Sequence, residues 1–466
     1  MKSIFYKLLL LFPLIFSVSC STSVKNEKSY FSGQIVNPKE QKIKIFKDDV
    51  LVYKGNFNAN NEFSIKLDSL TEGLYTFRHG DEFQYLYIEP KDSIAMRLNT
   101  WDFDESLIFS GIGAEKNNYL MQLFLENEKE EKLAYQFYKL NETDFLAKTD
   151  SIINTKLKKY NTFRTKNKVS EKFNALVQIA IYYPIYSIKE KYKTNSTRFN
   201  KRNHTTAKPL SSSFYDYRAK TNINDTRFLS YYAFKNYIGN YLLNQANAIK
   251  AKDRSKSLSA IILKQINDKI KTEKLKNIML HNAIINCLLD NKCCDKDKNE
   301  AKRIFYTNCT DKLKIKDVQT IVSSLDLLKR QTKFPSLEAV NQKGKTVVLN
   351  NLNSNKNIVF YFWPKEVNRI QAMLKRVQFL SKTHPDFTFI GLDNQLDNNK
   401  WKHFTKANKL AVNNQFQLVD KSQNKWFTNE IPRAVILNKK GVIMNDFSFL
   451  THHNFERLLK KVEKNQ

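Results

Sequence analysis

Four of the five cysteines fall within one short stretch of the chain, and thiols are the most chemically versatile groups in it. They are Cys287, Cys293, Cys294 and Cys309. Thiols can form disulfides or ligate metals, and four of them allow three full pairings that the sequence does not distinguish. Buried free thiols remain an alternative, because the surrounding sequence is helical in pattern. No histidine stands at ligand spacing beside Cys293 and Cys294, so we predict no metal site.

The other residues with catalytic potential form no recognisable constellation. No Gly-x-Ser-x-Gly elbow and no glycine-rich phosphate loop occurs in the sequence. His452 and His453 are adjacent and would point in different directions, which is unsuitable for a shared metal. We expect His384 and His403 to lie on surfaces. No cofactor is predicted.

The N-terminus has the pattern of an export signal. Lys2 and Lys7 precede an apolar run over residues 8–18, which Pro13 interrupts and which is too short to span a bilayer. Ser19-Cys20 then resembles a bacterial lipobox, in which the cysteine is lipidated and becomes the new N-terminus. Ser17 departs from the Leu or Val usual at its position. An ordinary signal peptide cleaved nearby, or a buried free cysteine, is the alternative.

We therefore predict a signal peptide over residues 1–20 and a lipid anchor at Cys20. The resemblance implies a protein of the bacterial cell envelope, held on a membrane and facing the periplasm. Disulfides can persist in such an oxidising compartment.

The charge is strongly basic, with 77 Lys and Arg against 46 Asp and Glu and a formal net charge of +31. Such an excess can indicate a polyanion partner. The sequence contains no dense basic run of the kind that nucleic-acid-binding tails carry. Together with the export signal, this favours a lysine-rich surface, and we predict no nucleic-acid partner.

Residues 24–112 show the alternation of β-strands. Phe63, Ile65 and Leu67 alternate with polar residues, and Ile94 and Met96 begin a similar series. Turn residues separate the apolar runs, so we predict a small antiparallel β-sandwich.

Residues 115–330 change to helical periodicity and predict an all-α region. Pro184 should kink or end its helix. Residues 193–224 are polar and contain Pro209, which predicts a long surface loop. The tyrosines of this region are assigned to the core in preference to a ligand groove. They are Tyr182, Tyr183, Tyr186, Tyr231, Tyr232 and Tyr241.

Near the C-terminus, residues 358–363 form an unbroken apolar and aromatic run that ends before Pro364. A buried central strand is the expected structure. Apolar residues then recur at three- and four-residue steps, which predicts an amphipathic helix. They are Val367, Ile370, Leu374, Val377 and Leu380.

This strand–turn–helix resembles the start of a thioredoxin-like domain of the TlpA type, and the resemblance extends over residues 334–466. Phe334-Pro335 resembles the family's leading hairpin, and the Ile431-Pro432-Arg433 stretch resembles its cis-proline loop. In that family the proline is cis and faces the redox site, so Pro432 should be cis. Arg433 stands where the family usually has Thr. Residues 24–112 resemble the β-rich accessory domain that often precedes such domains.

The resemblance places the family's Cys-x-x-Cys at Val367 and Ile370, and neither residue is cysteine. Thioredoxin chemistry needs a thiolate at a helix N-terminus and a second thiol three residues on. Val367 and Ile370 fit the apolar stripe of the helix instead. Three cations near the vacated position, Lys365, Arg369 and Arg433, could bind an anionic group, although an ordinary charged helix start is the alternative.

The predicted fold is therefore multidomain, with an N-terminal β-sandwich, a central all-α region and a C-terminal α/β thioredoxin-like domain. The favoured function is a redox-inactive lipoprotein that binds or scaffolds an envelope protein or ligand. The alternative is a thiol-disulfide oxidoreductase of the TlpA type that uses cysteines of the helical region.

Overall fold

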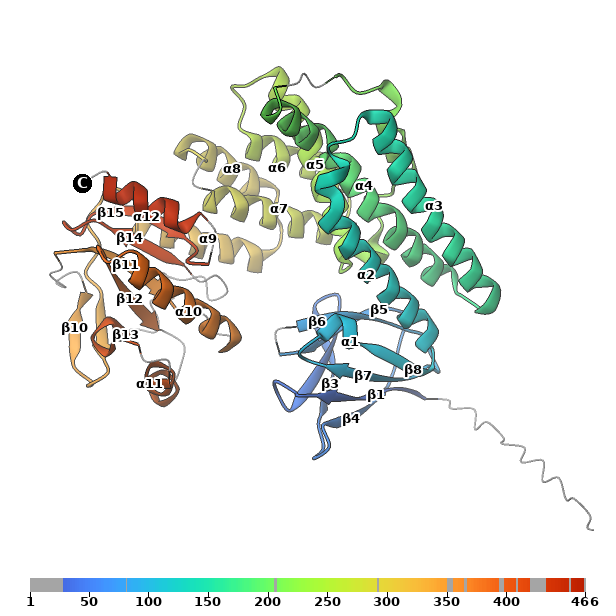
Figure 1. Cartoon of the computed structure of the whole chain (residues 1–466), viewed down its shortest axis with the longest axis horizontal. Helices are drawn as coiled ribbons and strands as arrows, with labels where there is room; N and C mark the ends of the chain where they lie inside the picture. Colours follow the sequence, from blue (N-terminus) through green and yellow to red (C-terminus); the bar gives the residue numbers. More distant parts are fainter. Residues whose placement is uncertain are drawn as a thin grey trace, which may run out of the picture.

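The computed structural model describes residues 28–80, 82–204, 208–290, 293–349, 355–363, 367–393, 398–407, 410–419, 433–451 and 454–464. Cys20, Lys365, Pro432 and the His452-His453 pair lie outside these ranges, so the predictions that depend on their structure stay predictions. Figure 1 shows two regions that contain sheets, at different ends of a helical region.

The N-terminal region consists of two four-stranded sheets. In the order of hydrogen bonding, the first contains β4 (Glu62–Leu67), β1 (Ser29–Val36), β7 (Ser93–Asn99) and β8 (Ile108–Ile112). The second contains β3 (Val50–Asn56), β2 (Lys42–Lys47), β5 (Gly73–His79) and β6 (Glu82–Ile88). Alternate residues of both sheets, among them Phe31, Ile45, Phe77 and Met96, enclose one shared core.

Strand β1 pairs antiparallel with β4 and parallel with β7, so both of its edges are occupied. All other strand pairs of these two sheets are antiparallel. A short helix, α1 (Phe103–Ser106), lies between β7 and β8 and contributes Phe103 to the core.

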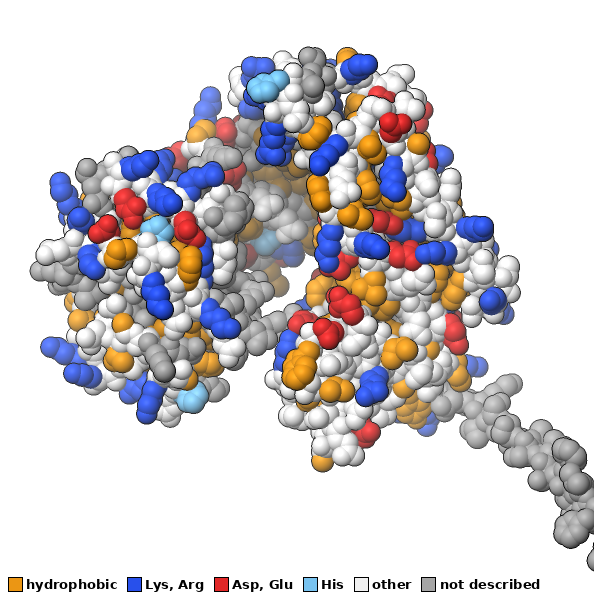
Figure 2. Space-filling model, viewed as in Figure 1, with side chains coloured by type: hydrophobic (Ala, Val, Ile, Leu, Met, Phe, Trp, Pro, Cys, Tyr) orange, Lys and Arg blue, Asp and Glu red, His pale blue; other side chains and the backbone are white. Residues whose placement is uncertain are grey.

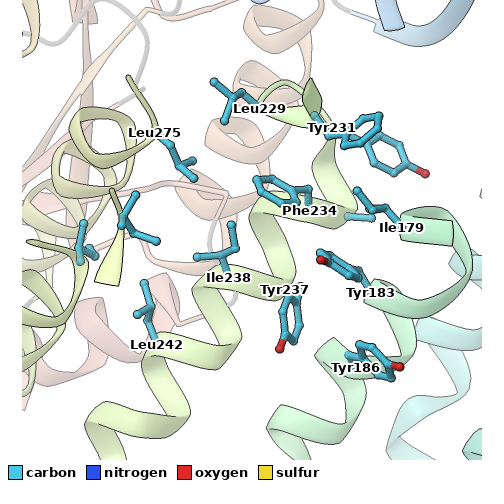
Figure 3. Packing of buried hydrophobic residues seen from close by; sticks show 14 of the residues in the cluster. Ile179, Tyr183, Tyr186, Leu229, Tyr231, Phe234, Tyr237, Ile238, Leu242 and Leu275 are labelled. Atoms are coloured by element: carbon cyan, nitrogen blue, oxygen red, sulfur yellow. The ribbon is translucent and has the colours of Figure 1, made fainter. Parts of the chain in front are cut away.

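The helical region follows directly. Its α-helices are α2 (Ala114–Phe137), α3 (Glu142–Lys166), α4 (Glu171–Arg202), α5 (Tyr232–Lys252), α6 (Leu258–Lys269), α7 (Glu273–Leu289), α8 (Asp295–Asn308) and α9 (Lys312–Leu327). Helix α4 packs against α2, α3 and α5, and α6 and α7 continue the array. Figure 3 shows the aromatic interface of α4 and α5, where Tyr183 and Tyr186 face Phe234 and Tyr237. The prediction of N-terminal β-sheets followed by a helical region is confirmed.

The N-terminal sheets and the helices are joined at the free edge of β6. Asn117 of α2 accepts a hydrogen bond from the backbone N–H of Tyr87 at 2.7 Å and donates one to its carbonyl at 2.8 Å. The ring of Tyr87 packs edge-on against Phe173 of α4, with 5.0 Å between centroids. A side-chain amide therefore satisfies an edge backbone that would otherwise be exposed to other chains.

Of the two outcomes expected at Pro184, an end of the helix is wrong, because α4 continues to Arg202, whereas a kink stays a prediction. The loop predicted from residue 193 is also wrong in its first part, since residues 193–202 belong to the same helix. The expected surface loop contains a 3-10 helix, η1 (Ser212–Lys220). Its Phe214 and Tyr217 are buried in the core, and Arg218 forms a two-point ion pair with the buried Glu190 of α4.

The C-terminal region is built on a seven-stranded sheet. Its strands, in hydrogen-bonding order, are β10 (Thr346–Val348), β9 (Glu338–Asn341), β13 (Gln415–Leu418), β12 (Phe387–Asp393), β11 (Asn357–Phe362), β14 (Ala434–Leu437) and β15 (Ile443–Ser448). The helices are α10 (Val367–Thr383), α11 (Asn398–Ala407) and α12 (Phe455–Lys464). β11 runs parallel to β12 and antiparallel to β14.

The predicted buried strand is β11, and every one of its residues is buried. Val359 and Tyr361 contribute to a core shared with α10 and α12, whereas Ile358 and Phe360 contribute to a core on the opposite face. This alternation explains why the whole run is apolar.

His384 is buried, with 5% of its surface exposed, which contradicts the surface position expected for it. Its ring lies against Phe387, and its Nδ1 is 3.4 Å from Glu463 of α12. A partner on a helix 79 residues away could not be read from local sequence.

Candidate functional site

The passage from β11 to α10 is where the family resemblance placed chemistry. Trp363 follows β11 and is buried, and α10 begins at Val367. Ile370 is fully buried in one cluster with Leu374 and Val359. Its side chain is thus a core contact between α10 and the sheet, and an aliphatic group there has no redox chemistry.

Arg433 precedes β14 and is one of the cations that the sequence assigned to an anion. It is 3% exposed, and its Nε donates to the carbonyl of Asp446 at 2.7 Å. Its Nη1 donates to the hydroxyl of Ser324 in α9 at 2.5 Å. Burial lowers the pKa of the Arg433 guanidinium to about 10, and the Asp446 carboxylate acts in the opposite direction. These bonds join the C-terminal sheet to the helical region, and an anion contact at Arg433 stays a prediction.

The described part of the structure does not include the side chains of the other residues predicted at this position. Arg369 lies in the first turn of α10, and only its backbone is described. Lys365 and Pro432 lie outside the described ranges.

The sequence did not reveal the polar side chains that lie buried beside β11. Tyr361 donates from its hydroxyl to Oε1 of Gln415 at 3.1 Å, inside the sheet. Nε1 of Trp363 is buried and has no hydrogen-bond partner among the residues that the structure describes. Gly391 of β12 makes room for both rings, since a Cβ there would be 2.7 Å from Trp363 Nε1 and 2.8 Å from Tyr361 Cζ. The sequence signal was a lone glycine inside a strand.

The cysteines of the helical region form one close pair. Sγ of Cys287, in α7, lies 2.7 Å from Sγ of Cys293, which stands just before α8. Cys287 is buried and Cys293 is half-buried, whereas Cys294 is exposed and Cys309 is buried elsewhere. Of the pairings left open by the sequence, the structure brings together Cys287 and Cys293.

This thiol pair is poorly suited to nucleophilic chemistry. Burial, followed by the hydrogen bond to Cys287, raises the pKa of the Cys293 thiol to about 12. Reactive cysteines have the opposite property, because the attacking species is the thiolate.

The tyrosines divide between the two roles considered for them. Tyr183, Tyr186 and Tyr231 are buried in the helical core, as expected. Tyr232 is 56% exposed, and together with Tyr231 it lines a cavity at the junction with β6. Tyr231 is thus a core residue whose side chain also borders this cavity, whereas Tyr232 lies outside the core position predicted for it.

Among the described residues, no helix is long and apolar enough to cross a membrane, and no group of three or more His, Cys, Asp and Glu side chains is placed to hold a metal ion. No protein-family profile matches the chain, and no curated protein sequence matches it.

Several solved structures similar to part of the chain come from Bacteroides species. A thioredoxin-like protein from Bacteroides caccae matches at 11% identity and a TM-score of 0.35, covering 53% of this chain and 90% of that protein. A thiol-disulfide oxidoreductase from Bacteroides fragilis matches at 19% identity and a TM-score of 0.24. The match covers 28% of this chain and 99% of the Bacteroides fragilis chain. The thioredoxin domain of a thiol-disulfide oxidoreductase from Bacteroides vulgatus matches at 18% identity and a TM-score of 0.24. The match covers 30% of this chain and 98% of that domain's chain.

Proposed function

We propose that the chain is a redox-inactive, thioredoxin-like lipoprotein of the bacterial cell envelope that binds or scaffolds a partner. The observation that carries the proposal is the fully buried Ile370, which packs in the core where the second thiol of a redox pair would stand. The partner is an envelope protein or ligand, not a nucleic acid.

The arrangement of the C-terminal elements supports the thioredoxin-like assignment. β11, α10 and β12 form a parallel strand–helix–strand unit, and β14 and β15 return antiparallel beside β11. The start of α10 is thus the point at which a family member would carry its nucleophile. No residue after Cys309 is cysteine, so the C-terminal sheet has no thiol of its own.

The reductase test uses the full chain and a variant in which Cys287, Cys293, Cys294 and Cys309 are all replaced by Ser. We expect neither protein to reduce the disulfides of insulin in the presence of a chemical reductant, beyond the rate of the reductant alone. Insulin reduction by the variant that lacks all four thiols would contradict the proposal.

The anchor is tested separately at Cys20. Cells that express the chain are given a fatty-acid analogue with a detectable tag, and the wild type is compared with Cys20→Ala. We expect the label on the wild type alone. Equal labelling of both proteins would remove the lipoprotein part of the proposal and leave the redox part untouched.

A second candidate function is thiol-disulfide exchange by the helical region, and the contact of Cys287 with Cys293 favours it. In that case two thiols would be oxidised to a disulfide as a disulfide in the substrate protein is reduced to two thiols. The raised pKa of Cys293 argues against this candidate, because little thiolate exists at neutral pH. Activity in the full chain that the four-serine variant loses would establish it.

A further inference from the structure

A cavity of about 330 Å³ lies where the N-terminal sheets meet the helical region. Its walls come from β6, α1, α2, α4 and the start of α5, and none of its lining residues belongs to β11 or α10. Figure 2 shows acidic and hydrophobic side chains together on the face where these elements meet. The volume is at the lower end of the range for small-molecule sites.

Aromatic side chains form one part of the wall. They are Phe83, Tyr85, Phe124, Tyr231 and Tyr232. The hydroxyl of Tyr85 accepts a hydrogen bond from the backbone N–H of Tyr232 at 2.8 Å, and its ring meets Tyr231 edge-on at 5.0 Å. Phe83 is 50% exposed and Tyr232 is 56% exposed, so both rings remain accessible to a ligand.

Acidic side chains form the other part. Four carboxylates line the cavity, against the single amine of Lys191. They are Asp104, Glu128, Glu130 and Glu131. This local excess of negative charge stands out in a chain whose formal net charge is +31. Burial raises the pKa of the Asp104 carboxyl, and it does the same for Glu130 although Lys156 opposes the effect.

Two of these carboxylates keep acceptor capacity. Gln84 donates to Oδ1 of Asp104 at 2.9 Å, and Oδ2 of Asp104 has no hydrogen bond within the described ranges. Glu128 is paired only with Lys132 of its own helix, at 3.1 Å, and its side chain is 44% exposed. A cation that enters the cavity could therefore be bound by carboxylate oxygens of Asp104 and Glu128 that still have acceptor capacity.

Polar groups of α4 and α2 lie beside the cavity at the proline-containing turn of α4. Pro184 has no N–H, so the carbonyl of Ala180 loses its helical partner, and Asn127 of α2 donates to that carbonyl at 2.9 Å. One turn further on, Ser187 is 2% exposed, and its hydroxyl has no hydrogen-bond partner among the residues that the structure describes. An unsatisfied buried hydroxyl is costly, and this one lines the cavity.

We propose that this cavity binds an ammonium group carried on an apolar body, with Asp104 and Glu128 facing the cation, the aromatic wall contacting the apolar part, and Ser187 accepting a hydrogen bond. Aromatic faces attract cations as well as apolar surface, so both parts of the wall suit the same ligand. The carboxylates exclude anions, and a neutral apolar ligand would leave them unused. The lining of this cavity contains no residue of the C-terminal sheet.

The ammonium can belong to a small amine or to a lysine side chain of a partner protein, and one titration series separates the two. The full chain is titrated by calorimetry with 2-phenylethylamine, and with its uncharged analogue 2-phenylethanol. A second arm uses a short peptide with one lysine beside a phenylalanine, and the same peptide with that lysine acetylated.

We expect the amine or the lysine peptide to bind at least about tenfold more tightly than its uncharged counterpart, the gain of one charge-assisted hydrogen bond. Asp104→Asn and Glu128→Gln should each weaken binding by about tenfold, and Ser187→Ala by about threefold. The matched control is Glu105→Gln, because Glu105 is the exposed neighbour of Asp104 and does not line the cavity.

Binding of the amine alone identifies a small-molecule site, and binding of the lysine peptide alone identifies a protein-docking site. The proposal is overturned if neither ammonium probe saturates at millimolar concentration, or if the uncharged probes bind equally well. It is also overturned if Glu105→Gln weakens binding as much as Asp104→Asn. Should Asp104→Asn not fold, Glu128→Gln and Ser187→Ala decide the outcome.

Discussion

Two regions of the molecule differ in how their side chains pack. One is where β11 leads into α10, and the other is the junction of β6 with α2, α4 and α5. At the first, where the sequence resembles a family with a known reaction, Ile370 completes a closed apolar core. At the second, where the sequence predicted core tyrosines, the structure leaves a cavity with carboxylates and an unsatisfied hydroxyl. The two regions thus differ in what they present to a ligand, since the first is a closed apolar core and the second has polar side chains around a cavity.

The largest expected effect comes from returning thiols to the first region. Val367→Cys combined with Ile370→Cys should raise insulin reductase activity above that of the wild type, because the first thiol would stand at the N-terminus of α10, where its pKa falls. Either single cysteine variant is the control and should remain inactive. Activity in the untouched chain, surviving in the four-serine variant, would break the contrast between the two regions.

The next effect tests how tightly the first region is packed. Gly391→Ala should lower the free energy of unfolding by about 3 kcal/mol, since its Cβ would approach Trp363 Nε1 to 2.7 Å inside the sheet. The matched control is Gly239→Ala in α5, which meets nothing within 4 Å. That change should stabilise the chain by about 0.5–1 kcal/mol. Equal effects in urea denaturation would show that the region below Trp363 is not closed.

A smaller effect is expected at the base of the cavity. Asn127→Ala should lower the free energy of unfolding by about 2 kcal/mol, because the carbonyl of Ala180 then loses the donor that replaces the missing N–H of Pro184, and Lys156 loses an acceptor at 2.6 Å. Gln122→Ala, on the exposed face of α2, should change it by less than about 0.5 kcal/mol. If the two variants have the same urea midpoint, Asn127 does not support the proline-containing turn of α4.

The smallest effect concerns a buried carboxyl near the junction. Burial raises the pKa of Asp92 to about 6, although a backbone hydrogen bond from Glu89 and the charge of Lys116 oppose it. The folded chain therefore binds a proton more readily than the unfolded chain, so this group stabilises the fold below about pH 4, and that stability is lost as pH rises through about 6. Asp92→Asn should be more stable than the wild type at pH 7 to 8 by about 1 kcal/mol.

Below pH 4 that advantage should vanish, which thermal unfolding across the pH range measures. An advantage that is constant with pH would mean that Asp92 acts through shape and not through its charge. If Asp92→Asn were more stable than the wild type only in the acidic range, the pKa of Asp92 would be lowered on folding, which is opposite to the assigned direction.

Strong local periodicity predicted the central elements of this fold. The apolar run at β11 and the stripe that ends in Leu380 indicated a buried strand and a helix. The stretch after residue 193 was misjudged because its polar composition hides Phe214 and Tyr217, whose burial depends on Tyr192 and Tyr186 in another helix.

The cavity could not be predicted, since its wall joins residues 83–85, 104, 124–131, 184–191 and 231–236. Each of these segments alone has the composition of an ordinary amphipathic surface. Contacts across long sequence separations, rather than local propensity, form this wall. The contact of Cys287 with Cys293 spans only six residues, but it depends on how the end of α7 lies against the start of α8.

The double pairing of β1 has a mechanical consequence. Residues from Ser29 are bonded to β4 on one side, and residues from Tyr30 are bonded to β7 on the other. A tension applied at the N-terminal end would act along β1, and the hydrogen bonds of both ladders lie across that direction. The hydrogen bonds of both ladders would then be loaded together in shear. An edge strand pulled away from its sheet would instead lose its hydrogen bonds one at a time. The first strand of the described chain is thus held more firmly against extension than an edge strand would be.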